Sequence, residues 1–194
     1  MVKVTCIEGP HGTGKTKTLN QCEDLIEIIK EGDITKTGTI LSPQGCTSQN
    51  IWIINWFKIM EKACNKYYDK ITQKYKKEGR LYFDRSPYSA VFYGELSEKE
   101  KDALEIIISK CIKEYEKVGL EFTFILFYDE SEEQTWKKVQ KRIESEKWRS
   151  KLKESNRSHL IRVRKEYLKR KYLWNICYYS KYLKNLKNYI KSLE

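Results

Sequence analysis

The sequence contains six cysteines but no two of them at C-x-x-C spacing. Isolated cysteines scattered along a chain argue against both a zinc site and a disulfide framework. Reduced thiols are typical of the cytosol, so this cysteine usage favours a cytoplasmic location.

Long apolar runs are also absent. No apolar stretch approaches the ~18 residues that a membrane span requires. The strand-like stretch VKVTCI begins directly after Met1, which leaves no room for a signal peptide. We therefore expect a soluble, unprocessed protein without a membrane partner.

No repeat, linker or low-complexity segment interrupts the 194 residues. A chain of this length can bury one hydrophobic core but is too short for two ordinary domains. We expect one domain over residues 1–194.

The net charge of +11 is concentrated in one segment, residues 137–171. This segment contains 15 Lys or Arg and 4 Asp or Glu, which accounts for the whole excess. Three interpretations of the segment are a lid over phosphates, a nucleic-acid surface and a solvated basic face. Charge alone is a poor guide to partners, and nucleic acid is the disfavoured one.

Residues 7–16 read IEGPHGTGKT and match the pattern G-x-x-x-x-G-K-[ST]. In this pattern backbone N–H groups surround a polyphosphate, the lysine contacts its oxygens and the hydroxyl binds Mg²⁺. The apolar stretch before it and the helical pattern after it are the context that the motif requires. The sequence therefore indicates ATP as phosphoryl donor, with Mg²⁺.

Strand and helix patterns alternate along the chain, which predicts an α/β fold with a parallel sheet covered on both faces. Capping residues Ser97 with Glu100, and Ser131 with Gln134, mark two of the helix starts. The predicted strands are 2–8, 38–42, 80–84, 121–128 and 176–180. The predicted helices are 15–31, 51–77, 97–118, 131–143, 158–175 and 181–194.

The third predicted strand is followed by DRSPYSAVFYG, residues 84–94. Ligands of α/β sheets bind at the carboxyl ends of strands, so this stretch is a second candidate site. Together with the phosphate loop, FILFYDESEEQTWKKVQKRI and RVRKEYL, it resembles the thymidylate kinase and deoxynucleoside kinase group of P-loop kinases. The resemblance implies a three-layer sandwich with a sheet of about five strands, a lid at about 142–157, and the homodimers common in that group.

The resemblance also implies roles for individual residues. Arg85 would grip an acceptor phosphate through its planar fork, Thr16 would bind Mg²⁺ directly and Asp84 would do so through water. Lid cations would neutralise the transferred group. The residues expected to contact ATP are Gly9, Gly12, Thr13, Gly14, Lys15, Thr16 and Lys17, and those expected in the lid are Arg142, Lys147 and Arg149. Among these, Lys15, Arg142 and Arg149 are candidate catalytic residues, with Asp84 and Arg85.

The acceptor is either a nucleoside or its 5′-monophosphate. A neutral 5′-hydroxyl gains from a carboxylate base, whereas a monophosphate is already anionic and needs none. In the nucleoside kinases of this group, that base is a glutamate just before a proline after the second strand. The corresponding stretch here is LSPQGC, with Ser42 ahead of Pro43, and it contains no acid. This interpretation favours a deoxynucleoside monophosphate kinase similar to thymidylate kinase, with a deoxynucleoside kinase as the alternative.

Recognition of the acceptor base and sugar requires amide and aromatic side chains. His11 is a candidate for a sugar hydroxyl, although a solvent-facing loop position fits it equally well. Aromatic residues at helical spacing are commonly core, so packing is the alternative for the aromatic candidates. The candidates are His11, Gln44, Gln49, Trp52, Trp56, Arg85, Tyr88, Ser89 and Tyr93.

A rival of another class is a nucleic-acid-stimulated P-loop ATPase. FILFYDE resembles the apolar strand and acidic pair of a Walker B element, with Asp129 and Glu130 in that role. The chain is short for such a motor, and no separate arginine finger can be identified.

Overall fold

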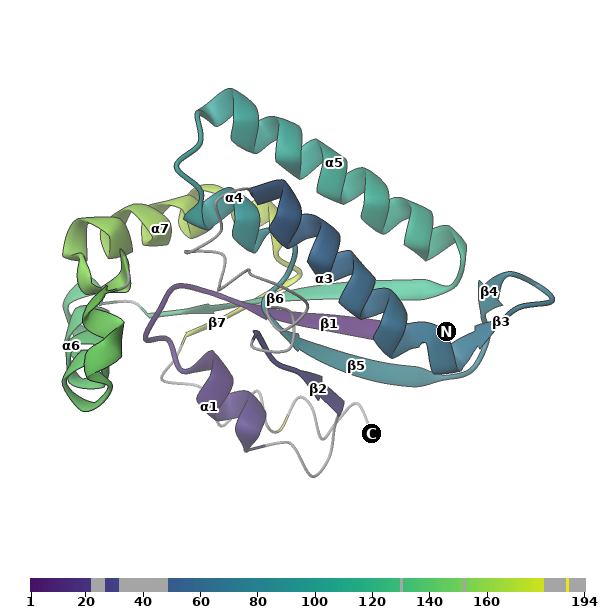
Figure 1. Ribbon diagram of the computed structural model, residues 1–194, viewed down its shortest axis with the longest axis horizontal. Helices are drawn as coiled ribbons and strands as arrows, with labels where there is room; N and C mark the ends of the chain where they lie inside the picture. The colour runs from purple at the N-terminus through teal and green to yellow at the C-terminus, as the bar shows by residue number, and fades with distance from the viewer. Residues whose placement is uncertain (22–26, 32–48, 130, 152, 180–187, 189–194) are drawn as a thin grey trace. The chain divides into compact units, whose positions relative to one another are not determined.

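The computed structural model describes residues 1–21, 27–31, 49–129, 131–151, 153–179 and 188 (Figure 1). Its main feature is a five-stranded sheet in the order β2-β5-β1-β6-β7, with helices around it, which confirms the predicted α/β fold class. Strand β2 pairs in parallel with β5, and β6 pairs in parallel with β7. The strands are β1 (Val2–Glu8), β2 (Glu27–Ile29), β5 (Gly79–Asp84), β6 (Leu120–Tyr128) and β7 (Ile176–Tyr179).

The chain forms two compact units. The first contains Met1–Cys6 and Ile26–Thr123, and the second contains Ile7–Leu25 and Phe124–Glu194. Within the described residues, no helix is both long and apolar enough to cross a membrane.

Two long helices of the first unit, α3 (Gln49–Cys64) and α5 (Glu98–Lys117), run side by side in Figure 1. The ring of Phe57 on α3 stacks on that of Tyr115 on α5 at 5.5 Å between centroids. Trp56 of α3 packs against Phe83 of β5 at 4.8 Å. The short helix α4 (Ser89–Tyr93) lies between β5 and α5 in the chain and is entirely buried. These contacts place α3 and α4 next to the end of β5.

The start of α5 confirms the predicted capping box. Ser97 Oγ accepts the Glu100 N–H, and the Glu100 carboxylate accepts the Ser97 N–H at 2.7 Å. The helix ends before Gly119, which has a φ of +102°. A Cβ at that position would lie 2.6 Å from the carbonyl oxygen of Tyr75, so glycine is required there.

The helical stretch predicted over 51–77, with one break, is helical only in its first part, and the prediction is wrong for its second half. After α3 the chain forms a 3₁₀ turn (Asn65–Tyr67) and a hairpin of β3 (Tyr68–Asp69) and β4 (Lys74–Tyr75). The Asp69 carboxylate accepts hydrogen bonds from the Ile71 N–H and the Thr72 hydroxyl, both at 2.9 Å. Such aspartate-to-backbone bonds compete with a helix. Ile71, between the two hairpin strands, is 94% exposed.

The helix predicted over 15–31 is also wrong at its end. Helix α1 spans Lys15–Asn20, and residues 27–29 form strand β2. Their pairing with Leu81–Phe83 of β5 is the long-range contact that decides this. A short apolar run fits a helix face and a strand equally well. The strand predicted at 38–42 lies outside the described residues.

Helices of the second unit surround the carboxyl half of β6. Helix α6 (Glu132–Ser145) begins at the predicted cap, where Ser131 Oγ accepts the Gln134 N–H at 3.2 Å. Helix α7 spans Arg157–Lys169 and so ends earlier than the predicted residue 175. The remaining elements are the 3₁₀ turns Lys147–Lys151, Lys153–Ser155 and Lys171–Leu173.

Strand β7 confirms the fifth predicted strand. Its approach to β6 is set by Asn175, whose N–H donates to the carbonyl of Phe124 at 2.9 Å and whose Oδ1 accepts the Phe124 N–H at 2.7 Å. The final helix predicted at 181–194 falls outside the described part of the chain, except for residue 188.

Candidate active site

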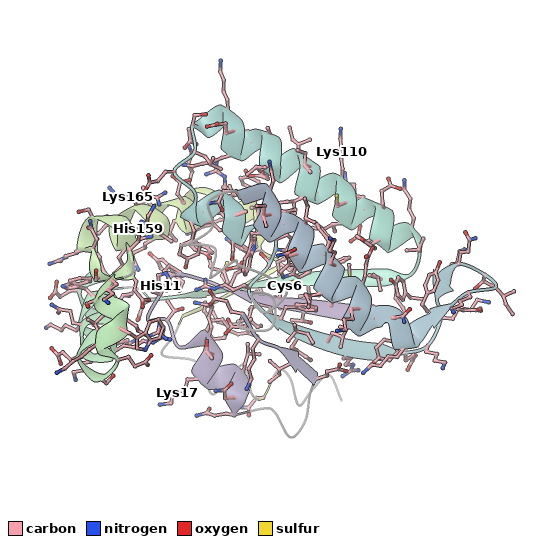
Figure 2. All side chains as sticks on the ribbon, in the orientation of Figure 1. Cys6, His11, Lys17, Lys110, His159 and Lys165 are labelled. Atoms are coloured by element: carbon pink, nitrogen blue, oxygen red, sulfur yellow. The ribbon has the colours of Figure 1, made fainter. Side chains whose placement is uncertain are left out.

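The phosphate loop follows β1 in the second unit and carries Lys15 at the start of α1. The Lys15 ammonium donates to the carbonyl oxygens of Gly9 at 2.8 Å and Pro10 at 2.9 Å, so the lysine lies over its own loop. Thr13 Oγ1 also donates to the Pro10 carbonyl. Thr16 and Lys17 are exposed, and Figure 2 shows the labelled Lys17 on the outer side of α1.

Backbone geometry makes the loop glycines necessary. Gly9, Gly12 and Gly14 have φ values of +143°, +77° and +88°, which glycine adopts most readily. A Cβ on Gly9 would lie 2.1 Å from the carbonyl oxygen of Phe127, and one on Gly12 would lie 3.0 Å from Val139. The loop is therefore seated closely on β6 and α6, with the backbone conformation that a polyphosphate cradle needs.

His11 is buried in this loop rather than facing solvent. Its Nδ1 lies 3.2 Å from Glu154 Oε2, and the two side chains are 4% and 1% exposed. Glu154 was not singled out in the sequence, because one acid in a basic segment carries no signal of burial. The contact joins the phosphate loop to the residues just before α7.

The lid cations predicted from the sequence lie in and after α6. Arg149 donates to Glu146 at 2.5 Å and to Glu154 at 2.9 Å, and its guanidinium lies 4.3 Å from the Trp148 ring centroid. The hydrogen bond from Arg149 holds the pKa of Glu146 below its usual value. Arg142 lies 3.6 Å from Glu146, while Lys147 is exposed. Two arginines thus share one carboxylate in this conformation.

Arg85 follows β5 in the first unit and is 97% buried, with a strained backbone φ of +97°. Its Nη1 donates to the hydroxyl of Tyr93 at 3.0 Å, and the guanidinium carbon lies 5.0 Å from the centre of the Tyr93 ring. Its Nε donates to Glu31 at 3.3 Å. The guanidinium is therefore oriented by two side chains from different segments.

Glu31 is the functional candidate that the sequence prediction missed. It follows β2, and its carboxylate is 27% exposed beside the nearly buried Arg85. The omission came from the strand assignment, since with β2 at Glu27–Ile29 an acid stands two residues after that strand. The stretch after the strand predicted at 38–42 lies outside the described residues, so the inference drawn from it stays a prediction.

Two tryptophans of α3 support the residues after β5. The indole N–H of Trp56 donates to the Arg85 carbonyl, and that of Trp52 donates to the Ser86 carbonyl, both at 3.1 Å. Both side chains are 0% exposed. Their N–H groups point at the backbone that carries Arg85.

The other acceptor-side candidates also lie in the first unit. The side-chain oxygen of Gln49 is buried and has no hydrogen-bond partner among the described residues. The Tyr88 hydroxyl lies 2.9 Å from that of Ser109 on α5, and burial raises the pKa of Tyr88. Ser89 is buried in α4, and Asp84 is buried at the end of β5. Gln44 lies outside the described residues.

The acidic pair considered as a Walker B element is described only in part. Asp129 is buried and accepts a hydrogen bond from Lys138 at 2.6 Å. Glu130 falls outside the residues that the structure describes.

Comparison with known proteins shows a similarity in fold. No family model and no curated protein sequence matches the chain. A structure of deoxyadenosine kinase from M. mycoides with bound dATP aligns at a TM-score of 0.55 and 15% identity, covering 97% of this chain and 99% of that one. The same kinase with the products dCMP and a flexible dCDP aligns at 0.53 and 16% identity, with the same coverage. The chain therefore has the fold of these kinases over nearly its whole length.

Proposed function

We propose that the protein is a deoxynucleoside kinase, which transfers the γ-phosphoryl group of ATP to the 5′-hydroxyl of a deoxynucleoside. The observation that carries the proposal is the Glu31–Arg85 contact after β2 and β5. A 5′-hydroxyl gains from a base that accepts its proton, and the Glu31 carboxylate, held in place by Arg85, would take that role. The monophosphate kinase favoured by the sequence needs no such carboxylate.

Each residue has a defined role in the proposed reaction. The 5′-oxygen bonds to the γ-phosphorus while the bond from that phosphorus to the β,γ-bridging oxygen breaks, and ADP leaves. The hydroxyl proton passes to the Glu31 carboxylate. Arg85 orients Glu31 and the acceptor oxygen, while Lys15 and the loop N–H groups hold the donor phosphates.

Mg²⁺ fits the donor residues present. Thr16 is exposed directly after Lys15 and would offer a hydroxyl ligand. The metal would neutralise charge on the phosphates. Arg142 and Arg149 would neutralise negative charge on the transferred phosphoryl group once they leave Glu146 and Glu154.

Base recognition is assigned to Gln49. A buried amide oxygen without a partner among the described residues can accept a hydrogen bond from an amino or imino group of a base. The known activity of the fold neighbour, a kinase acting on deoxyadenosine, supports a deoxynucleoside as acceptor.

The test is a panel of acceptors with ATP and Mg²⁺. We expect ADP formation with deoxynucleosides and none above background with the 5′-monophosphates. Glu31→Gln should lower kcat on the best nucleoside by about 10²–10⁴-fold, the usual contribution of a general base. The matched control is Glu27→Gln on the same strand, since Glu27 pairs with the exposed Lys66 instead. Turnover of monophosphates alone, unaffected by Glu31→Gln, would contradict the proposal.

A further inference from the structure

A buried carboxylate stands directly before the phosphate loop. Glu8 is the last residue of β1 and is 0% exposed. One of its oxygens, Oε2, accepts the N–H of Gly9 at 3.3 Å and the hydroxyl of Tyr167 at 2.6 Å. The second bond joins residues 159 positions apart in the sequence. The proposed reaction uses neither side chain.

Tyr167 comes from α7, a helix that holds the ends of two strands. Arg164, one turn earlier on the same face, donates to the carbonyl of Asp129 and, at 2.6 Å, to the hydroxyl of Tyr128 at the end of β6. The start of α7 is defined by Asn156, whose side chain accepts the N–H groups of Ser158 and His159. The helix is thus placed by its own cap and by β6, independently of Glu8.

The Tyr167 ring has little freedom to move. It is 0% exposed and stacks on Trp174 at 5.7 Å between centroids, with 27° between the ring planes. The Trp174 indole N–H donates to the Tyr167 carbonyl at 3.2 Å. The hydroxyl is therefore held at one point, where it meets Glu8.

We propose that Tyr167 is a positioning residue for the phosphate loop, acting through Glu8. The Tyr167 hydroxyl directs Oε2 of Glu8 to the Gly9 N–H. The carbonyl of the same Gly9 accepts a hydrogen bond from the Lys15 ammonium. Because a buried carboxylate must find donors, a Glu8 that lost the tyrosine would turn to the loop N–H groups or to Lys15. A triphosphate needs those same donors. This inference rests on the proposed function only in taking the loop to bind ATP.

The direct test removes one oxygen atom by Tyr167→Phe. A hydrogen bond to a charged group is worth enough that we expect ATP to bind about tenfold more weakly, measured by calorimetry without any acceptor. The KM for ATP should rise in parallel, while the KM for the nucleoside stays within about twofold. A purely structural role would move both constants together, and that result would overturn the inference.

Two further variants separate positioning from folding. Trp174→Phe removes the indole bond to the Tyr167 carbonyl but leaves the hydroxyl, so it should lower Tm while leaving ATP affinity within about twofold. Adding Glu8→Gln to Tyr167→Phe removes the negative charge that competes for Lys15, and should recover most of the lost ATP affinity. An unchanged or weaker affinity in the double variant would contradict the proposed route through Glu8.

The outcome can be told apart from that of the proposed function. Because ATP affinity is measured without an acceptor, a tyrosine-dependent affinity in a protein that phosphorylates no nucleoside supports this inference and refutes the kinase assignment. Full nucleoside kinase activity with unchanged ATP affinity in Tyr167→Phe would support the kinase assignment and refute this inference.

Discussion

At the scale of single residues, Arg85 shows how a strained backbone is held in place. A φ of +97° is costly for any residue with a Cβ, by about 1–3 kcal/mol, and persists only where surrounding contacts determine it. Here the Trp56 indole holds the Arg85 carbonyl, and Tyr93 and Glu31 hold the guanidinium. The strain places the side chain beside the candidate base.

Replacing Arg85 with lysine tests the fork geometry. Lysine keeps the positive charge but cannot contact Tyr93 and Glu31 at once through a planar group. We expect Arg85→Lys to lower kcat/KM for the nucleoside by roughly 100-fold, on the order of 3 kcal/mol of transition-state stabilisation. The dissociation constant of ATP should be unchanged, and equal loss of ATP binding would argue against an acceptor role.

Trp56→Phe tests the support of that backbone. The change leaves the buried Arg85 carbonyl without its donor, at a cost of about 1–3 kcal/mol. We expect the free energy of unfolding in urea to fall by that amount and the KM for the nucleoside to rise. Trp52→Phe is the matched control, since it removes the same kind of bond from the next residue, Ser86. An equal effect of both changes on the nucleoside KM would mean that Trp56 has no special role in placing Arg85.

At the scale of elements, the phosphate loop depends on its contact with β6. Two loop glycines, one against β6 and one against α6, differ in how closely a methyl group would approach its neighbours. On Gly9 it would lie 2.1 Å from the Phe127 carbonyl oxygen, and on Gly12 it would lie 3.0 Å from a side-chain methyl of Val139 and 3.1 Å from the Thr135 carbonyl oxygen. The Gly9 contact requires backbone to shift, whereas the Gly12 contacts require a movement of only a few tenths of an ångström.

We therefore expect Gly9→Ala to be more damaging than Gly12→Ala. Gly9→Ala should abolish measurable ATP binding and lower Tm, whereas Gly12→Ala should weaken ATP binding and leave it detectable. Both variants keep Lys15 and Thr16, so any difference reflects the loop backbone. ATP titration together with thermal unfolding makes the comparison, and the reverse order of severity would show that the loop is not seated as described.

The capping box of α5 makes stability depend on pH in the acid range. Hydrogen bonds from the Ser97 side chain and then its backbone N–H lower the pKa of Glu100 below 4.5. A pKa that is lower in the folded state gives stability at pH values above the unfolded pKa, and this is lost as the pH falls through the folded pKa. Glu100→Gln should therefore reduce Tm at pH 6 more than at pH 3. Glu116→Gln, which removes a carboxylate from the same helix without touching the cap, is the control.

At the scale of the whole molecule, the basic segment, residues 137–171, forms ion pairs within the second unit. Arg157 donates to Glu133 at 2.9 Å, and Arg170 donates to Glu166 at 2.6 Å. Arg149 contacts two carboxylates, and Arg164 contacts a carbonyl and a hydroxyl. Several cations of residues 137–171 thus have structural partners, which weakens the case for a nucleic-acid surface.

Adding nucleic acid should not stimulate ATP consumption. We expect no rise in ADP formation when single- or double-stranded DNA or RNA replaces the nucleoside at about 0.15 M salt, where a surface of unpaired cations would still bind phosphates. Stimulation by DNA or RNA without any small acceptor would favour the P-loop ATPase alternative.

Much of the fold was readable along the chain. The phosphate loop, the cap at Ser97 and the strands at 80–84, 121–128 and 176–179 depend on local signals, and the structure contains each of them. Prediction failed where one stretch fits two structures. The end of the predicted helix at 15–31 became a strand because of its pairing with β5, and Asp69 turned the end of another helix into a hairpin.

The sequence by itself determined the phosphate-loop motif, because Gly9, Gly14, Lys15 and Thr16 lie within eight consecutive residues and their spacing is a local pattern. Only the tertiary structure decided which acid stands beside Arg85, since Glu31 and Arg85 are 54 positions apart and meet through the parallel pairing of β2 with β5. The same is true of Tyr167 and Glu8. Hydrogen bonds between distant residues depend on strand pairing and helix packing, and no local pattern in the sequence encodes them.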